Sequence, residues 1–271
     1  MNLIKAIILG IVQGLSEFLP ISSSGHLVLV QQILGFSEGG LAFEVFVHFG
    51  TLMAVIWVFR KDIVKMILAT PDMFRLTRSD LPEERREYAR LNLFILIGSV
   101  PAAVIGLLFE DAIEGLFESH LLVLGMLFIT GLIMWSSRYT RSRGRQMKGW
   151  HAFLIGFAQA FAILPGISRS GSTIVSGLWM GLDRQKVARF SFLLSGPVIF
   201  GATLLKAKEI WDSPLPNTEL FHLLMATIAA MVAGYFAIVW LLKIIRDQKL
   251  EWFGVYCIAV SIIGLILVLW L

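Results

Sequence analysis

The amino-acid sequence predicts an all-α integral membrane protein with six transmembrane helices and two broken re-entrant helical hairpins, arranged as two inverted-topology repeats. Three observations predict this class: the composition, the length of the apolar runs, and a motif that occurs twice. Of the 271 residues, 57% are hydrophobic and only 15% are charged, with a mean hydropathy of +0.79. Soluble domains carry about 25% charged residues, and disordered chains are poor in apolar ones, so both classes are excluded.

Six apolar runs supply the predicted transmembrane helices. A helix that crosses the bilayer needs about 20 mostly apolar residues. Four uncharged runs qualify, and two shorter ones become spans if their flanking side chains snorkel to the interface. In chain order the six runs are 45–59, 91–109, 121–137, 190–205, 220–242 and 252–271. The N-terminal apolar stretch 6–12 is too short to cross and lacks a cleavage pattern, so we expect mature protein there and not a signal peptide.

The basic residues lie on one side of these spans. Segments 60–90, 138–148, 184–189 and 243–249 together hold 19 of the 23 Lys and Arg residues, whereas 110–120 holds four acids and no base. Because cytoplasmic loops carry the excess of Lys and Arg, we expect the basic segments in the cytoplasm and both termini outside. On a chain this hydrophobic, the positive charge marks the cytoplasmic face, and no nucleic-acid partner is predicted.

Two absences from the sequence narrow the chemistry further. The single cysteine, Cys257, excludes a disulfide framework and a multi-cysteine metal site. The chain also lacks the G-x-x-x-x-G-K-[ST] pattern, which argues against a nucleotide site of the P-loop type.

Two stretches, 6–34 and 152–182, are predicted to be the broken hairpins. Each is an apolar helical run that is interrupted by a proline and a turn rich in Ser and Gly. They share residues at an offset of about 146 positions, and the match persists at Gly50 and Gly196. Each copy holds one hairpin and three spans, an odd number, so the second copy must be inverted. We expect a single membrane domain, 1–271, with repeat one at about 1–137, a cytoplasmic linker at about 138–149 and repeat two at about 150–271.

The first break carries a candidate acid–base group. Gln13 and Glu17 lie four residues apart and project from one face of a half-helix that Pro20 ends. The run 22–25, Ser-Ser-Ser-Gly, then opens the next half-helix, whose free N–H groups suit an anion. His26 follows within its first turn. A proline that only kinks an ordinary span is the alternative, but a kink does not require such a turn beside it.

The second break has the same build but carries Arg169. A charge inside the bilayer costs roughly 2.5–3.5 kcal/mol on insertion scales, so it needs a partner or a function. A guanidinium suits a phosphate bidentately, and Ser168, Ser170 and Thr173 add hydroxyls. Because paired breaks of inverted repeats usually flank a binding site near the midplane, we predict phosphate recognition between them. The alternative is that Arg169 only pairs with Glu17.

One further polar pair lies on the first predicted span. Glu44 and His48 are four residues apart and therefore share a helix face. Two interpretations stay open for them: support of the site, or a structural pair.

The chain resembles the undecaprenyl-diphosphate phosphatase family, also called bacitracin-resistance proteins. The resemblance rests on two motifs, Gln-x-x-x-Glu followed by Phe-Leu-Pro-Ile-Ser-Ser-Ser-Gly-His over 13–26, and Pro-Gly-Ile-Ser-Arg-Ser-Gly-Ser-Thr over 165–173. It covers nearly the whole chain, including Phe43-Glu44-Val45 and the run that begins at Phe190. Many members carry Glu where this chain has Gln13, so the resemblance does not supply a second acid on this helix.

The resemblance implies a multi-pass enzyme of the bacterial cytoplasmic membrane, among its lipids. It would hydrolyse undecaprenyl diphosphate to undecaprenyl phosphate and inorganic phosphate at the outer face, recycling the carrier lipid for peptidoglycan synthesis and cell-wall biogenesis. Because bacitracin sequesters the diphosphate, the enzyme would confer resistance to this antibiotic. A divalent cation, Mg²⁺ or Ca²⁺, is implied as an aid, although few carboxylates could hold it in an all-protein site. The resemblance is compatible with a homodimer. A transporter or flippase for polyprenyl phosphate is the alternative class, since inverted repeats suit alternating access.

The motifs give a set of expected site residues. Glu17, Ser23, His26 and Arg169 are expected to be catalytic. Substrate binding is expected from Gln13, Ser22, Ser168, Ser170 and Thr173. Three nucleophiles stay open: Ser23 with His26 as general base and Glu17 orienting the imidazole, His26 itself, or water.

Overall fold

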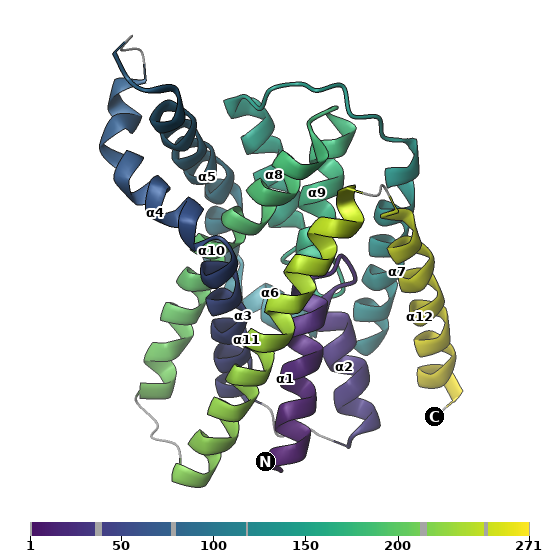
Figure 1. Ribbon diagram of the computed structural model, residues 1–271. Coiled ribbons are helices and arrows are strands. Elements are labelled where there is room, and N and C mark those ends of the chain that lie inside the picture. Colours follow the sequence, from purple (N-terminus) through teal and green to yellow (C-terminus); the bar gives the residue numbers. More distant parts are fainter. Residues whose placement is uncertain are drawn as a thin grey trace.

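The computed structural model describes residues 2–35, 40–76, 80–117, 119–211, 216–246 and 249–270. Its regular elements, in chain order, are α1 (Leu3–Phe18), α2 (Ser23–Ile33), α3 (Gly40–Val58), α4 (Arg60–Ala69), the 3-10 helix η1 (Thr70–Arg75), α5 (Glu83–Leu108), α6 (Glu110–Phe117), α7 (His120–Ser136), the 3-10 helix η2 (Ser137–Tyr139), α8 (Gly149–Phe161), α9 (Arg169–Trp179), α10 (Arg184–Trp211), α11 (Asn217–Arg246) and α12 (Glu251–Trp270). The predicted all-α class is confirmed (Figure 1).

The transmembrane helices agree with the prediction except at the first of them. Five segments of the described residues are long and apolar enough to cross a membrane, and they overlap the predicted spans in α5, α7, α10, α11 and α12. The last residue of the span predicted over 252–271 lies outside the described residues. The span predicted over 45–59 lies in α3, which counts as the sixth only when it is combined with the helical segment that follows. The two segments meet at Phe59 at an angle of 79°.

The bend has a cause in the sequence. Arg60, Lys61 and Asp62 follow α3 directly, and charged side chains are expensive inside the hydrocarbon core. The chain therefore turns and continues as α4, which leaves Val64, Ile67 and Leu68 exposed. Such an amphipathic helix suits the membrane interface.

Both predicted broken hairpins are present as helix–turn–helix units. α1 and α2 have 16 and 11 residues, and α8 and α9 have 13 and 11, so each is shorter than a bilayer-spanning helix. α2 returns toward the start of α1, where the Lys5 ammonium donates to the Leu34 carbonyl at 2.7 Å. Figure 1 shows the two turns meeting in the middle of the bundle.

Small residues let the hairpins pack closely against the long helices. α1 runs beside α11, and its Gly10 touches the backbone of Ala226. α8 packs on α5 in the same manner, with Gly156 against the backbone of Gly98. Helices in a bilayer gain little from the hydrophobic effect between them, so such close backbone approach supplies much of their association. These crossings fix the height of each break in the bundle.

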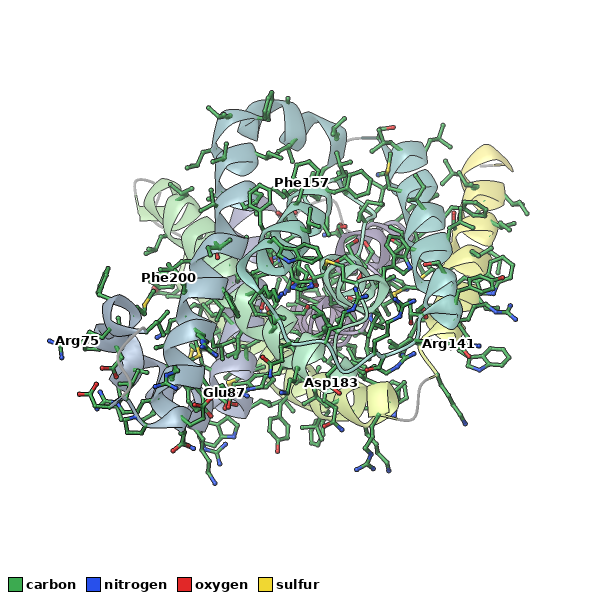
Figure 2. The ribbon with its side chains drawn as sticks, turned by 90° about the horizontal axis from the view of Figure 1, so that it is seen from above. Arg75, Glu87, Arg141, Phe157, Asp183 and Phe200 are labelled. Atoms are coloured by element: carbon green, nitrogen blue, oxygen red, sulfur yellow. The ribbon has the colours of Figure 1, made fainter. Side chains whose placement is uncertain are left out.

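The basic segments gather at one end of the bundle, and both termini lie at the other (Figure 1). Figure 2 looks onto the basic end, where Arg75, Glu87, Arg141 and Asp183 are labelled. At this end Arg189 of α10 pairs with Asp62 of α4 at 2.6 Å and with Glu87 of α5 at 3.6 Å. These ion pairs join the bent pair α3–α4 to the rest of the bundle.

Replacing Gly156 by alanine is expected to lower the melting temperature measurably. A methyl group there would collide with the Gly98 backbone, and overpacking of this kind costs about 1–3 kcal/mol. Gly201→Ala in α10 is the matched control, because a methyl group at Gly201 meets no atom within 4 Å and alanine favours the helix. Thermal unfolding in detergent compares the two, and equal melting temperatures would contradict the close contact of α8 and α5.

Candidate active site

The two breaks are built alike. α1 ends at Phe18, and α2 starts after Ser22, whose hydroxyl accepts a hydrogen bond from the Gly25 N–H at 3.3 Å. α9 starts after Ser168, whose hydroxyl accepts from the Gly171 N–H at 3.1 Å. Each serine thus caps the half-helix that follows it. The half-helices begin at the Ser/Gly-rich turns, as predicted.

The two breaks also lie against each other, as predicted from their pairing. The Gly166 N–H of the second break donates to the Ser24 hydroxyl of the first at 3.0 Å. A second hydrogen bond runs in the same direction, from the Ser170 hydroxyl to the Leu19 carbonyl at 3.3 Å. Thr130 of α7 supports the second break, since its hydroxyl donates to the Gly166 carbonyl at 2.8 Å and accepts from the Ser168 N–H at 2.9 Å.

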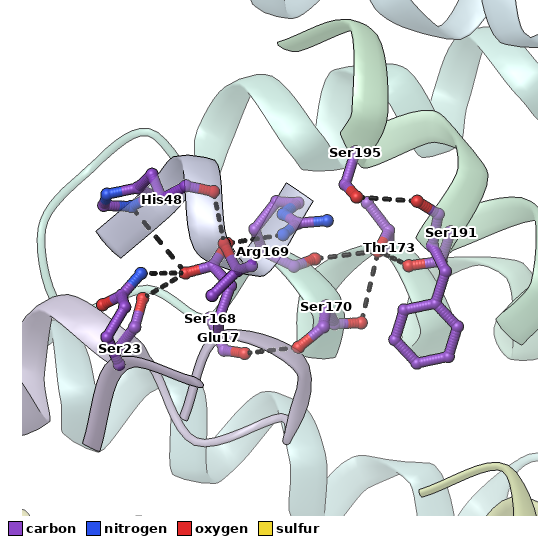
Figure 3. A network of polar contacts seen from close by, with 12 residues as sticks. Glu17, Ser23, His48, Ser168, Arg169, Ser170, Thr173, Ser191 and Ser195 are labelled. Carbon is purple, nitrogen blue, oxygen red and sulfur yellow. Dashed lines mark hydrogen bonds and ion pairs between the residues drawn. The ribbon is translucent and has the colours of Figure 1, made fainter. Parts of the chain in front are cut away.

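Glu17 is the centre of the polar network in Figure 3. One carboxylate oxygen, Oε1, accepts from Arg169 Nη2 at 2.6 Å. The other, Oε2, accepts from the Ser23 hydroxyl at 2.7 Å and from Gln13 Nε2 at 3.0 Å. His48 Nε2 lies 3.9 Å from the same oxygen. The Glu17 side chain is only 8% exposed, so these partners replace water around its charge.

Arg169 joins the second break to this carboxylate. The ion pair between Arg169 and Glu17, which we considered as the alternative to phosphate recognition, is present. The Arg169 side chain is 13% exposed. Its second terminal nitrogen, Nη1, is buried and has no hydrogen-bond partner among the described residues. A buried N–H group without a partner costs free energy, so Nη1 is a candidate donor to an anionic ligand.

A cavity of about 200 Å³ opens onto this network. Of the predicted site residues, those that line it are Gln13, Glu17, Ser22, Ser23, Ser168 and Arg169. Gln31 near the end of α2 and Glu44 near the start of α3 line it as well. Both lie on the side of the breaks toward the chain termini, so the cavity extends toward that end of the bundle.

Ser170 and Thr173 are absent from this lining, contrary to our expectation for substrate contacts. Ser170 is fully buried and bonds Leu19 across the breaks. The Thr173 hydroxyl donates to the Arg169 carbonyl at 2.8 Å and contacts the Ser191 hydroxyl of α10 (Figure 3). In α9 these two side chains face the bundle, and they therefore hold the break that presents Arg169.

His26 is also placed differently from our expectation. It does not line the cavity, and the expected contact between its imidazole and Glu17 is absent. Its Nδ1 donates instead to the Ser22 carbonyl at 2.8 Å, and its Nε2 contacts the Tyr256 hydroxyl of α12 at 2.8 Å. The arrangement of Ser23, His26 and Glu17 as a relay is therefore not the one observed, because Ser23 bonds Glu17 directly.

His48, and not His26, is the histidine beside Glu17, with its Nε2 3.9 Å from Glu17 Oε2. Its Nδ1 donates to the Glu44 carbonyl at 2.7 Å, so the predicted pair contacts through the backbone and not through the Glu44 carboxylate. The helical spacing of Glu44 and His48 was the signal for His48. Nothing in the sequence singled out Tyr256 or Thr130, which lie on apolar helices.

A metal site made only of protein ligands does not fit these side chains. Within the described residues, no group of three or more His, Cys, Asp and Glu side chains is arranged to hold a metal ion. Both oxygens of Glu17 are already engaged by Arg169, Ser23 and Gln13. The divalent cation therefore stays a prediction from the resemblance, and no step below is derived from it.

Comparison with known proteins gives one consistent family. Residues 6–263 match the family described as "Bacitracin resistance protein BacA". The undecaprenyl-diphosphatase of Halothermothrix orenii is 43% identical over 270 residues, which cover 98% of each chain. That of Methanobrevibacter smithii is 42% identical over 274 residues, covering 97% of this chain and 96% of its own. That of Carboxydothermus hydrogenoformans is 43% identical over 262 residues, covering 94% of each.

Proposed function

This chain belongs to the bacitracin resistance protein family, and on that premise we propose that it hydrolyses undecaprenyl diphosphate to undecaprenyl phosphate and inorganic phosphate. Its relatives along nearly the full length are named undecaprenyl-diphosphatases. We place the reaction at the outer face of the cytoplasmic membrane. In a bacterium, it would return the carrier lipid to peptidoglycan synthesis and confer resistance to bacitracin.

One observation supports the reaction above the others. A hydroxyl, a carboxylate and a guanidinium, those of Ser23, Glu17 and Arg169, meet within hydrogen-bond distance at the wall of one cavity. A phosphatase needs a nucleophile, a base to take its proton and a cation for the phosphoryl oxygens. Ser23, Glu17 and Arg169 supply one group for each of these three functions.

The proposed first step is attack by Ser23 on the terminal phosphorus. Glu17 takes the hydroxyl proton, since Ser23 already donates to Glu17 Oε2 at 2.7 Å. The Oγ–P bond forms as the bond to the bridging oxygen breaks, and undecaprenyl phosphate leaves with the electron pair of that bond. Arg169 stabilises the charge on the phosphoryl oxygens through its Nη groups. Glu17 passes the proton from Ser23 to the departing undecaprenyl phosphate and is again a carboxylate. It then takes a proton from the water that attacks the phosphoserine and gives it to Ser23 Oγ as the P–Oγ bond breaks, which releases phosphate and restores the hydroxyl.

The placement at the outer face is supported by charge and by the cavity together. The Lys- and Arg-rich segments gather at the end opposite the termini, and such segments mark the cytoplasmic side. The cavity extends toward the termini, through Gln31 and Glu44. A diphosphate head group in the outer leaflet would therefore reach Arg169 from that side.

The two inverted repeats are part of this proposal. Each hairpin has a serine that caps the helix after its break. Each hairpin also packs on a long helix from the other half of the chain, α1 on α11 and α8 on α5. Such an exchange of partners is expected when two copies are related by an axis in the membrane plane.

A cysteine-labelling experiment tests the orientation. Cys257→Ser is expected to fold and to remain active, because the buried Cys257 thiol donates to the Pro20 carbonyl, at 3.9 Å, and a serine hydroxyl can donate to the same oxygen. On this background, Gly115→Cys should react with an impermeant thiol reagent in spheroplasts, and Ser142→Cys should not. Both positions are exposed, one on α6 and one in the basic linker. The reverse pattern would overturn the outward-facing site.

The activity itself is tested with purified protein in detergent. We expect phosphate release from authentic undecaprenyl diphosphate in the absence of any membrane or gradient. A transporter or flippase would release none under these conditions, so no release from folded protein would refute the proposal.

A further inference from the structure

Tyr256 contacts the first break from a helix that lies outside the cavity wall. α12 packs on α7, and Tyr256 does not line the cavity that holds Glu17 and Ser23. Its ring nevertheless stacks on His26, with ring centroids 5.5 Å apart and an interplanar angle of 11°. The Tyr256 hydroxyl and His26 Nε2 are 2.8 Å apart.

The hydrogen bonds of His26 fix the direction of this contact. His26 Nδ1 lies 2.8 Å from the Ser22 carbonyl, and a carbonyl oxygen can only accept, so Nδ1 carries the proton. In the neutral imidazole, Nε2 is then the acceptor and the Tyr256 hydroxyl is the donor. A short chain of hydrogen bonds thus runs from Tyr256 through His26 to the backbone of Ser22.

Ser22 needs such support because its backbone is strained. Its φ of 69° is the one positive value at a non-glycine residue in the part of the chain that the structure describes. A left-handed backbone at an L-residue costs free energy and persists only where its surroundings hold it. Ser22 directly precedes Ser23, so its ψ of 106° sets the direction of the peptide that carries the Ser23 side chain toward Glu17.

The second break provides an internal comparison. Ser168 occupies the position of Ser22 but has an ordinary φ of −75°. Its carbonyl accepts from the Ser172 N–H at 2.9 Å, just as the Ser22 carbonyl accepts from the His26 N–H at 3.3 Å, so Ser172 stands where the first break has His26. The Ser172 hydroxyl has no hydrogen-bond partner among the described residues. The imidazole therefore occurs at the break with the strained serine and is absent from the break with the relaxed one.

We propose that Tyr256 is a positioning residue for the reaction: through His26 it holds the strained Ser22 backbone and thereby aims the Ser23 hydroxyl at Glu17. His26 is then the link in this chain and neither the base nor the nucleophile. The inference rests on the proposed function insofar as Ser23 is the attacking group. It adds to that function a residue of the last helix, 230 positions from His26 in the sequence.

The first test removes only the hydroxyl. Tyr256→Phe keeps a ring for stacking on His26, and we expect kcat to fall roughly threefold to tenfold, as for loss of one neutral hydrogen bond. KM should change less than twofold, because Tyr256 does not touch the substrate cavity. Tyr235→Phe on α11 is the matched control, since the Tyr235 hydroxyl makes no hydrogen bond among the described residues. An unchanged kcat in Tyr256→Phe would refute the proposal.

A second test separates positioning from acid–base chemistry. In His26→Asn, the side-chain amide replaces Nδ1 and can still donate to the Ser22 carbonyl. In His26→Gln, the amide lies near the position of Nε2, so the hydrogen bond to the Ser22 carbonyl is lost. We expect His26→Asn to be at least about ten times as active as His26→Ala and His26→Gln. Adding Tyr256→Phe to His26→Asn should then have little further effect, because the acceptor is gone. An Asn variant as inactive as Ala, or fully additive losses, would overturn the positioning function.

A third measurement does not depend on turnover. In a Cys257→Ser, Ser23→Cys protein, the rate of alkylation by iodoacetamide reports how the side chain at position 23 is presented. Tyr256→Phe should change this rate more than threefold, and Tyr235→Phe should leave it unchanged. An alkylation rate that is the same with and without Tyr256→Phe would refute the proposal that Tyr256 positions residue 23. If the rate changes but the parent protein releases no phosphate, only the proposed reaction is refuted.

Discussion

Replacing Arg169 by alanine is expected to reduce phosphate release by roughly a hundredfold to a thousandfold, the usual loss when one preorganised donor to a transition state is removed. Arg169 is the cation at the cavity wall, and its Nη1 has no hydrogen-bond partner among the described residues. Arg169→Lys keeps the charge but loses the planar fork, so it should lose nearly as much activity. Turnover of purified protein with undecaprenyl diphosphate measures both variants.

The control for Arg169 must separate chemistry from folding. Arg169→Ala leaves Glu17 buried without its cation, and such an unpaired charge costs about 3–5 kcal/mol. Arg169→Lys avoids this loss, and its melting temperature should stay close to that of the parent protein. Arg189→Lys is the matched variant, since Arg189 pairs with Asp62 at the basic end and away from the cavity. It should remain active. Near-native turnover of folded Arg169→Ala would show that Arg169 is only a structural partner of Glu17, whereas near-native turnover of Arg169→Lys would show that the charge is sufficient without the planar fork.

The positions of the two breaks could be predicted because they depend on local chemistry. Pro20 and Pro165 disfavour a helix, and the Ser/Gly turns beside them supply caps for the next one. Both features are needed, because α5 and α10 continue through Pro101 and Pro197. The structure accordingly ends α1 and α8 before these prolines. Their pairing followed from the internal repeat, and the contacts of Glu17 with Arg169 and Ser23 join residues that the motifs had singled out.

The orientation of individual side chains could not be predicted in the same manner. Motif spacing placed His26 one turn from Ser23, which suggested a shared function. On α2, however, its Nδ1 reaches back to the carbonyl at the start of the helix, and its ring turns toward α12. That choice depends on Tyr256, which is distant in sequence and lies on an apolar helix without any motif. The charged residues after α3 explain the bend at Phe59, but the ion pair of Asp62 with Arg189 of α10, a helix distant in sequence, could not be predicted from them.

Replacing Ser23 by alanine is expected to reduce turnover by roughly a thousandfold or more, because removal of a nucleophile leaves only binding and electrostatic contributions. Ser99→Ala is the matched control, since the Ser99 hydroxyl donates to the Ile95 carbonyl of its own helix, at 2.8 Å, and Ser99 does not line the cavity. The Ala variant should fold normally, as it removes a hydrogen bond to Glu17 but leaves the Glu17–Arg169 ion pair in place.

The identity of the adduct decides between the three nucleophiles. Rapid quench of the parent protein with substrate labelled in its terminal phosphate should trap an adduct that survives acid and is lost in base, as a phosphoserine does. Ser23→Ala should form none, and Glu17→Gln should form it far more slowly, because an amide cannot take the proton of the hydroxyl. An acid-labile, base-stable adduct that persists in Ser23→Ala would assign the attack to a histidine. Turnover of the parent protein with no adduct on any time scale would assign it to water, and Ser23 would then act by orienting that water beside Glu17.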